Sequence, residues 1–256
     1  MLQGKNALIT GSTSGIGLGI AKALAMKGAN IMLNGFGDNA GPKAQIEALG
    51  VKALYHPADM SQVEEIGAMM SYAAAELGRI DILVNNAGIQ HVARIENFPV
   101  KQWDAIIAIN LSSAFHTTRL ALPAMQAANW GRIINIASTH GLVGSIEKSA
   151  YVASKHGIVG LTKVTALENA TSGVTCNAIC PGWVLTPLVQ KQVDAKAAAL
   201  GISNTEACIL LLGEKSPSLQ FTTPEELGEL AVFLCSSAAN NVRGAAWNMD
   251  GAWLAQ

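Results

Sequence analysis

A tyrosine, a lysine and a serine are spaced so that they can carry out proton transfer. Tyr151 and Lys155 are four residues apart, and Ser138 lies thirteen residues before the tyrosine. Residues four apart share one face of an α-helix, so the Lys155 ammonium can lie beside the Tyr151 phenol and stabilise the phenolate. A free phenol has a pKa near ~10, and this neighbour is expected to lower the pKa of Tyr151 toward that of a useful base. The set indicates proton transfer coupled to redox chemistry.

A glycine-rich turn near the start of the chain indicates the redox partner. Residues 10–17 read TGSTSGIG and directly follow an apolar run. Glycines 11, 15 and 17 allow a tight turn and a close backbone approach to a pyrophosphate, which the N–H groups of the following helix would bind. An ordinary turn is the alternative, but the position between a first strand and a first helix favours a dinucleotide.

The end of the second expected strand favours NAD over NADP. An acidic residue there would bind the adenosine ribose, and an arginine would accept a 2′-phosphate. The segment Asn34-Gly35-Phe36-Gly37 contains neither type, and no lysine or arginine lies between Lys5 and Lys22. Asp38 is the nearest acidic candidate for the ribose. We expect NAD, with NADP as the alternative.

An alternation of strands and helices must position these groups. Several strand-length runs are almost continuously aliphatic, as expected where helices cover both faces of a parallel sheet. The sequence therefore predicts an α/β protein, a single-domain Rossmann-type doubly wound parallel sheet over residues 1–256. The expected strands are 7–10, 31–34, 52–55, 80–84, 132–136, 174–179 and 246–249, and helices are expected at about 15–27, 43–49 and 224–234.

Residues 187–221 interrupt this alternation. The region begins with Pro187, has helical composition and shows no evident strand. An insertion at the carboxyl edge of a sheet can cover the binding crevice, so we expect a small helical lid; an inert helical pair is the alternative.

The composition argues against several other classes of protein. Only 14% of the residues are charged and the formal net charge is -1, so no basic surface for nucleic acid is expected. The four cysteines lack the spacing of a zinc or redox motif, and no metal site is expected. No secretory signal and no apolar run of ~18 residues is evident, which predicts a cytoplasmic protein without a membrane partner.

The chain resembles the short-chain dehydrogenase/reductase family over essentially its whole length. The marks are TGSTSGIG at 10–17, NNAG at 85–88, Asn110, Ser138, Tyr151-x-x-x-Lys155 and PGWVLTP at 181–187, in this order. The resemblance implies an NAD-dependent oxidoreductase that acts on a secondary alcohol and assembles as a homotetramer.

The resemblance also implies residue roles. Asn110, Ser138, Tyr151 and Lys155 would form a catalytic tetrad. In it Tyr151 takes the alcohol proton as hydride leaves for the nicotinamide, Ser138 binds the same oxygen, Lys155 lowers the pKa of the phenol and holds the ribose, and Asn110 positions a relay water. Asp59 and Met60 would contact the adenine, and Val184 and Thr186 the nicotinamide carboxamide. The full cofactor-binding set is Gly11, Thr13, Ser14, Gly15, Ile16, Gly17, Phe36, Asp59, Met60, Asn86, Ala87, Gly88, Tyr151, Lys155, Pro181, Gly182, Val184 and Thr186.

Polar residues on the predicted carboxyl-edge loops and the lid can bind a small carboxylate. Lys148 would supply the charge, and Trp183 and Trp253 an apolar wall for a methyl group. The surrounding segments resemble family members that interconvert (R)-3-hydroxybutyrate and acetoacetate in ketone-body and polyhydroxybutyrate metabolism. The expected substrate-binding set is Gln90, Ser138, His140, Lys148, Tyr151, Trp183, Gln192 and Trp253.

Two alternative functions stay open. An NADPH-dependent 3-oxoacyl-carrier reductase would share the fold and the tetrad, but the uncharged adenosine end and the expected carboxylate cluster argue against it. A nucleotide-binding protein that has lost catalysis would share the fold, but the intact tetrad argues against that.

Overall fold

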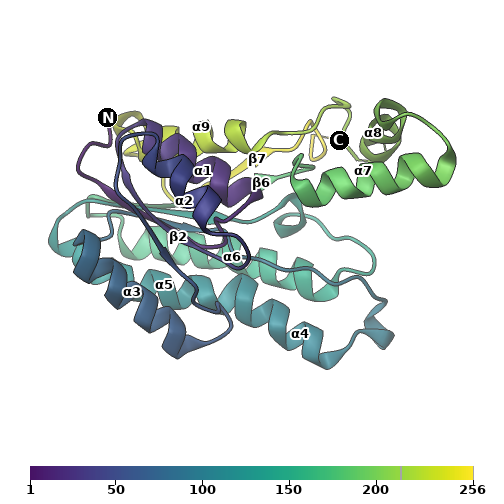
Figure 1. Cartoon of the computed structure of the whole chain (residues 1–256). Helices are drawn as coiled ribbons and strands as arrows, with labels where there is room; N and C mark the ends of the chain where they lie inside the picture. The colour runs from purple at the N-terminus through teal and green to yellow at the C-terminus, as the bar shows by residue number, and fades with distance from the viewer. Residues whose placement is uncertain (214, 256) are drawn as a thin grey trace.

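A parallel sheet of seven strands runs through the computed structural model and carries helices on both faces (Figure 1). The structure describes residues 1–213 and 215–255. The strand order is β3-β2-β1-β4-β5-β6-β7, with every neighbouring pair parallel. This confirms the predicted doubly wound α/β class. The strands are β1 (Asn6–Ile9), β2 (Asn30–Asn34), β3 (Ala53–His56), β4 (Ile82–Asn85), β5 (Gly131–Ile136), β6 (Val174–Pro181) and β7 (Ala246–Met249).

The helices form one layer on each face of the sheet, as Figure 1 shows. One layer consists of α1 (Gly15–Met26), α2 (Ala40–Glu47) and α9 (Pro224–Cys235). The other consists of α3 (Val63–Leu77), α4 (Val100–Ile107), α5 (Ser113–Ala127) and α6 (Ser149–Glu168). A π-helical stretch, Ala108–Ser112, joins α4 to α5.

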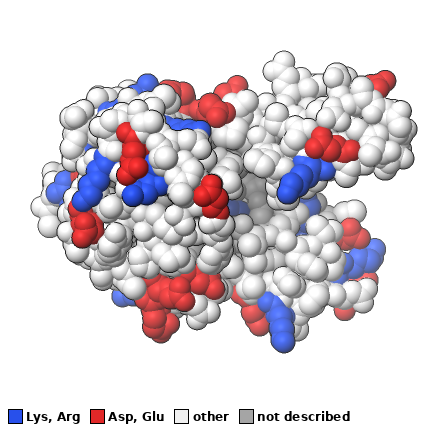
Figure 2. Space-filling model, in the orientation of Figure 1, with Lys and Arg blue, Asp and Glu red and all other residues white. Residues whose placement is uncertain are grey.

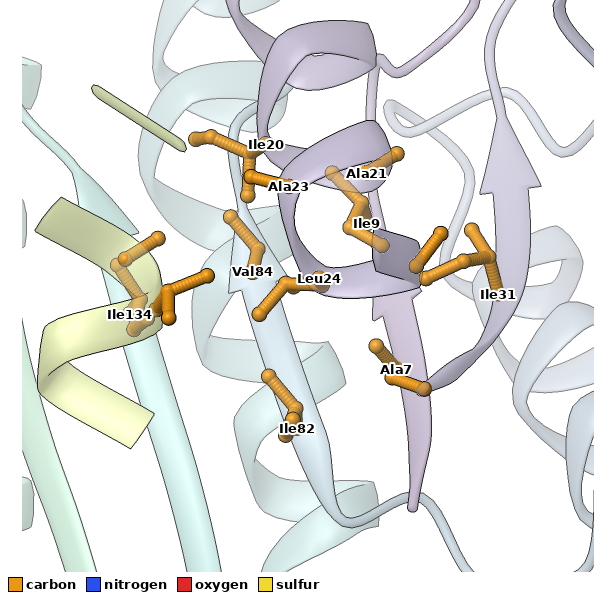
Figure 3. Packing of buried hydrophobic residues seen from close by; sticks show 14 of the residues in the cluster. Ala7, Ile9, Ile20, Ala21, Ala23, Leu24, Ile31, Ile82, Val84 and Ile134 are labelled. Carbon is orange, nitrogen blue, oxygen red and sulfur yellow. The ribbon is translucent and has the colours of Figure 1, made fainter. Parts of the chain in front are cut away.

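The alternation of side chains along the strands fills a separate core on each face. Ile9 and Val84 point to the α1 and α9 layer, whereas Leu8 and Leu83 contribute to the core under α3 and α5. Figure 3 shows the first of these cores, in which Leu24 of α1 lies against the sheet. Burying each large aliphatic side chain contributes roughly 1.5–3 kcal/mol, so both cores hold the carboxyl ends of the strands in fixed positions.

Small residues let α1 and α9 cross closely. A Cβ atom added at Gly19 would lie 2.5 Å from the Cβ of Pro224, and one added at Gly228 would lie 2.7 Å from the Cβ of Ala23. Pro224 begins α9, as predicted, and Thr223 caps it in a capping box with Glu226. The crossing therefore depends on the absence of a side chain at two positions.

Replacing Gly19 with valine should destabilise the fold. Overpacking a close helix crossing lowers the free energy of unfolding, here by about 2 kcal/mol or more. Denaturant titration with far-UV circular dichroism measures this change. The control is Gly67→Ala on α3, where an added Cβ meets nothing within 4 Å, and where the better helix propensity should stabilise the protein by about 1 kcal/mol. Equal effects of the two substitutions would contradict the close crossing.

Two helices occupy the region that interrupts the alternation. α7 (Pro187–Leu200) and α8 (Asn204–Gly213) lie between β6 and β7 and project beyond the sheet, near the C-terminus (Figure 1). They form a small core of their own around Val193 and Ala207. Among the described residues no single helix is long and apolar enough to cross a membrane. Only α7 and α8 taken together have the required length and hydrophobicity, and the two helices are bent by 108° relative to each other.

Candidate active site

The glycine turn after β1 is locked to the loop after β4. The Thr10 hydroxyl accepts the N–H groups of Asn86 and Ala87 at 3.0 Å each, and Asn86 Nδ2 donates to the Gly11 carbonyl at 2.8 Å. A Cβ at Gly11 would lie 2.9 Å from the Ala87 Cα, and one at Gly17 would collide with the Gly11 carbonyl. The turn therefore leaves open backbone at the start of α1, which fits a pyrophosphate.

The loop after β6 reaches the same place. Gly15 has a φ of +54°, and a Cβ there would lie 3.3 Å from the Thr186 methyl group. Thr186 also caps α7, since its hydroxyl accepts the Val189 N–H at 3.3 Å. Val184 is buried and pairs with Thr222 in an isolated bridge. The expected nucleotide contacts from β1, β4 and β6 therefore gather at one edge of the sheet.

None of the described residues that are expected to contact the adenosine is a lysine or an arginine. Asn34 is the last residue of β2, and its side chain is bound within the protein, because its Oδ1 accepts the Gly11 N–H at 3.2 Å. Phe36 is exposed, and its carbonyl accepts a hydrogen bond from the Thr13 hydroxyl at 3.0 Å. Asp59 Oδ1 accepts the Ser61 N–H at 2.8 Å, and Met60 is buried against the α3 layer.

Asp38, the acidic candidate for the ribose, also has a structural role. Its Oδ1 accepts the Ala40 N–H at 3.0 Å and the Gly41 N–H at 3.3 Å, so it caps α2. This cap also explains why α2 begins at Ala40, three residues before the predicted start at residue 43.

Asn110 joins three parts of the site from the π-helical stretch. Its Oδ1 accepts the Ile89 N–H at 2.8 Å, and its Nδ2 donates to the Ile89 carbonyl at 2.9 Å and to Ser154 Oγ at 3.3 Å. Such π turns occur often at functional sites. The side chain is buried and fixes the loop after β4 against α6, while its role in holding a water stays a prediction.

Lys155 is a buried cation below the tyrosine. Its Nζ donates to the Ile136 carbonyl at 2.7 Å and lies 5.6 Å from the centre of the Tyr151 ring. Burial lowers the pKa of Lys155 to about 8. Lys155 is therefore not a solvated surface charge, because its side chain is buried at the end of β5.

Burial opposes the activation that is predicted for Tyr151. Burial raises the pKa of Tyr151, and a hydrogen bond with Ser138 opposes this increase only in part. The sequence argument placed the ammonium next to the phenol correctly but omitted desolvation, which disfavours the phenolate.

Three aromatic side chains form a continuous line from Tyr151 to the C-terminal segment. The Tyr151 and His140 rings are 6.0 Å apart, and the His140 and Trp253 rings are 5.3 Å apart, both edge to face. His140 also contacts Ser138, whose Oγ accepts the His140 N–H at 3.2 Å and lies 3.4 Å from Nδ1. His140 thus positions Ser138, a contact that the sequence did not predict.

His140 should make the protein sensitive to acid. Burial, followed by the charges of Lys148 and Lys215, lowers its pKa from 6.5 to about 4. Between these values the unfolded chain binds a proton that the folded chain does not, so stability falls as the pH drops from about 6.5 and the loss is complete near 4. The full effect is about 3 kcal/mol.

The measurement compares urea unfolding at pH 7 and pH 4.5. His140→Asn should lose at least 1 kcal/mol less stability than the wild type between these two values, an order-of-magnitude figure. His156→Asn on the exposed side of α6 is the matched control and should behave like the wild type. If His140→Asn loses as much stability between pH 7 and pH 4.5 as the wild type does, His140 is not buried as a neutral imidazole.

Lys148 lies where two loops meet. Ala93, after β4, forms a parallel bridge with Lys148, and its N–H donates to the Glu147 carbonyl at 2.9 Å. Glu147 has a φ of +63°, a strained value that holds Lys148 at the start of α6. Burial and the charge of Lys215 lower the pKa of Lys148. The bridge between Ala93 and Lys148 brings the loop that carries Gln90 to the same edge of the sheet as the Lys148 ammonium.

The structure assembles the remaining substrate residues only in part. Gln90 and Gln192 are exposed, on the loop after β4 and on α7, and neither is hydrogen-bonded to His140 or Lys148. Trp183 packs edge to face on Phe221 at 6.5 Å, and its buried indole N–H has no partner among the described residues. Trp253 is the tryptophan that contacts His140.

One cation of this region was missed by the sequence interpretation. Lys215, just after α8, lies 5.8 Å from the centre of the Trp253 ring and acts electrostatically on both His140 and Lys148. Its only signal was a lysine within the predicted lid, and its contact with the C-terminal segment depends on tertiary structure.

The fold and this arrangement define a dehydrogenase-type site, and comparison with known proteins agrees. The sequence model described as short chain dehydrogenase matches residues 5–197, and the chain belongs to this family. It is 69% identical to a D-beta-hydroxybutyrate dehydrogenase from Cupriavidus necator over 100% of both chains. It is 54% identical to a protein of the same name from Rhizobium meliloti, covering 98% of this chain and 99% of that one. A solved actinorhodin polyketide ketoreductase with NADPH superposes with a TM-score of 0.90 at 34% identity, covering 99% of both chains.

Proposed function

We propose that this protein is an NAD-dependent dehydrogenase that interconverts (R)-3-hydroxybutyrate and acetoacetate. The observation that carries the proposal is the contact between the Tyr151 and His140 rings, 6.0 Å apart, beside the half-buried Lys148 at the start of the same helix α6. A candidate proton-transfer group and a candidate anion-binding group thus lie at the same end of α6. The relatives named D-beta-hydroxybutyrate dehydrogenase support the same substrate.

Each side chain has a separate role in alcohol oxidation. Tyr151 receives the hydroxyl proton, and Ser138 hydrogen-bonds the same oxygen as it becomes a carbonyl. Lys155 holds a positive charge below the phenol and favours the phenolate while the proton moves. Lys148 fixes the carboxylate, so that the carbon bearing the hydrogen is oriented. The nicotinamide, when bound, supplies the hydride acceptor.

NAD is proposed because the described residues that are expected to contact the adenosine include no lysine or arginine. A 2′-phosphate would therefore have no cation to bind there. Asn34 and Phe36 stand at the end of β2, and the Asp38 carboxylate already caps α2. An enzyme of this kind should therefore show a higher kcat/KM with NAD than with NADP. The polyketide ketoreductase similar in fold was solved with NADPH, so the ratio must be measured in this protein.

A substrate panel tests the proposed function. Purified protein is assayed with NAD and with NADP on each enantiomer of 3-hydroxybutyrate, on longer hydroxy acids and on the methyl ester. We expect turnover of the (R)-acid with NAD and much poorer turnover of the neutral ester. Equal kcat/KM on acid and ester would overturn the carboxylate pocket, and preference for a carrier-linked 3-oxoacyl thioester with NADPH would favour the reductase alternative.

We further propose that residues 1–256 act as one catalytic domain, with α7 and α8 as its lid, in a cytoplasmic homotetramer. Exposed apolar residues on the outer helices, Phe115 on α5 and Val164 and Leu167 on α6, favour burial between copies. Light scattering coupled to size exclusion measures the assembly, and a monomer would contradict it.

A further inference from the structure

The turn after α8 holds Lys215 against the C-terminal segment. The Leu212 carbonyl accepts the N–H groups of Lys215 at 2.9 Å and of Ser216 at 2.7 Å. Ser216 is buried, and the Ser218 N–H donates to the Gly251 carbonyl at 3.1 Å. The backbone that follows Lys215 is therefore tied to the C-terminal segment, and the Lys215 ammonium lies over Trp253.

Lys215 is linked to His140 through Trp253, whose ring lies 5.8 Å from the Lys215 Nζ and 5.3 Å from the His140 ring. Lys148 comes from the start of α6, and Lys215 comes from the end of the lid. Both act on the ring of His140, and Lys215 acts on Lys148. Figure 2 shows a hollow between the projecting lid helices and the body of the molecule, with positively charged side chains at its edge.

No carboxylate of the described part of the chain forms an ion pair with either lysine. Asp250, close by in the C-terminal segment, uses its two oxygens to accept the N–H groups of Ala252 and Leu254 at 3.1 Å each. Two like charges facing one space repel each other, and an anion placed between them removes the repulsion.

We propose that Lys215 is a second anion-recognising residue of the substrate pocket, which makes the lid itself a determinant of specificity for carboxylate substrates. This inference rests on the proposed function, because it assigns a further residue to the same pocket. A carboxylate has two oxygens that each accept charge-assisted hydrogen bonds, so Lys148 and Lys215 can bind it together. A neutral ester gains nothing from either charge.

Lys215→Met tests the proposal in the full-length enzyme. We expect KM for (R)-3-hydroxybutyrate to rise roughly tenfold, with kcat and the KM for NAD within about twofold of the wild type. The KM for the methyl ester should not change, and Lys215→Arg should restore most of the affinity for the acid. The matched control is Lys191→Met, which removes an exposed lysine from α7 and should leave every constant unchanged.

A purely structural role of Lys215 predicts a different pattern. It would change the KM for the acid and the KM for the methyl ester by the same factor, and Lys215→Arg would not restore acid binding selectively. That result overturns the proposal, and so does an unchanged KM for the acid. Butyrate binding to the NAD complex, followed by calorimetry, provides a readout without turnover. If the wild type does not oxidise 3-hydroxybutyrate, the proposed function fails, whereas a Kd for butyrate tenfold weaker in Lys215→Met still supports the anion site and an equal Kd overturns it.

Discussion

Tyr151→Phe should reduce kcat/KM for alcohol oxidation by roughly a factor of 1,000 or more, since general acid–base catalysis typically contributes 10²–10⁴-fold. The substitution removes one oxygen atom and leaves the ring that packs on His140 at 6.0 Å. Cofactor affinity should stay within about twofold, because Lys155 and the glycine turn remain in place. Steady-state kinetics and a separate titration of NAD measure the two effects.

The pH dependence makes this prediction more specific. Burial raises the pKa of Tyr151, so its proton must leave before the phenolate can accept one from the alcohol. Oxidation should therefore become faster as the pH rises, and reduction should become slower, until Lys155 loses its charge near its pKa of about 8. In Tyr151→Phe this dependence should disappear.

The control for the tyrosine is on α3. Tyr72→Phe removes the same hydroxyl group from an exposed ring that packs on His56 at 5.6 Å. It should have wild-type kinetics. Near-normal turnover of Tyr151→Phe, or an equal loss in Tyr72→Phe, would remove Tyr151 from the proton-transfer step.

Much of the fold could be predicted because its signals are local. The apolar runs located the seven strands of the described sheet, and the helix expected from residue 224 is α9. The glycine turn was recognisable because strand, turn and helix follow one another within a few residues. Where a boundary was missed, as at α2, the reason was a single capping carboxylate on Asp38.

The electrostatic state of the site could not be predicted in the same way. The spacing of Tyr151 and Lys155 gave their proximity, but the pKa of each depends on how much of the chain surrounds it, and burial shifts both toward the neutral form. Lys215 and Trp253 come from the lid and the C-terminal segment, and only the folded chain shows that they meet. Residue spacing identifies chemical groups, whereas desolvation determines their charge.

The largest effect on substrate binding is expected at Lys148. A hydrogen bond to a charged group contributes about 1.5–3 kcal/mol, which corresponds to roughly a 10- to 100-fold rise in KM for the acid in Lys148→Met. The side chain is half-buried at the start of α6, and burial lowers its pKa, so its charge has a desolvation cost that a bound carboxylate would offset. Cofactor binding should not change, because the glycine turn is separate from this loop.

The kinetic pattern distinguishes charge recognition from a structural effect. In Lys148→Met the KM for the methyl ester should stay close to the wild-type value, so that the enzyme loses its preference for the acid. Lys101→Met removes an exposed lysine from α4 and serves as the control for loss of one positive charge. It should leave the KM for the acid and for the methyl ester unchanged. A parallel loss on acid and ester would show that Lys148 supports the loop rather than the anion. If the double substitution of Lys148 and Lys215 weakens acid binding by less than the product of the two single effects, both lysines contact one carboxylate.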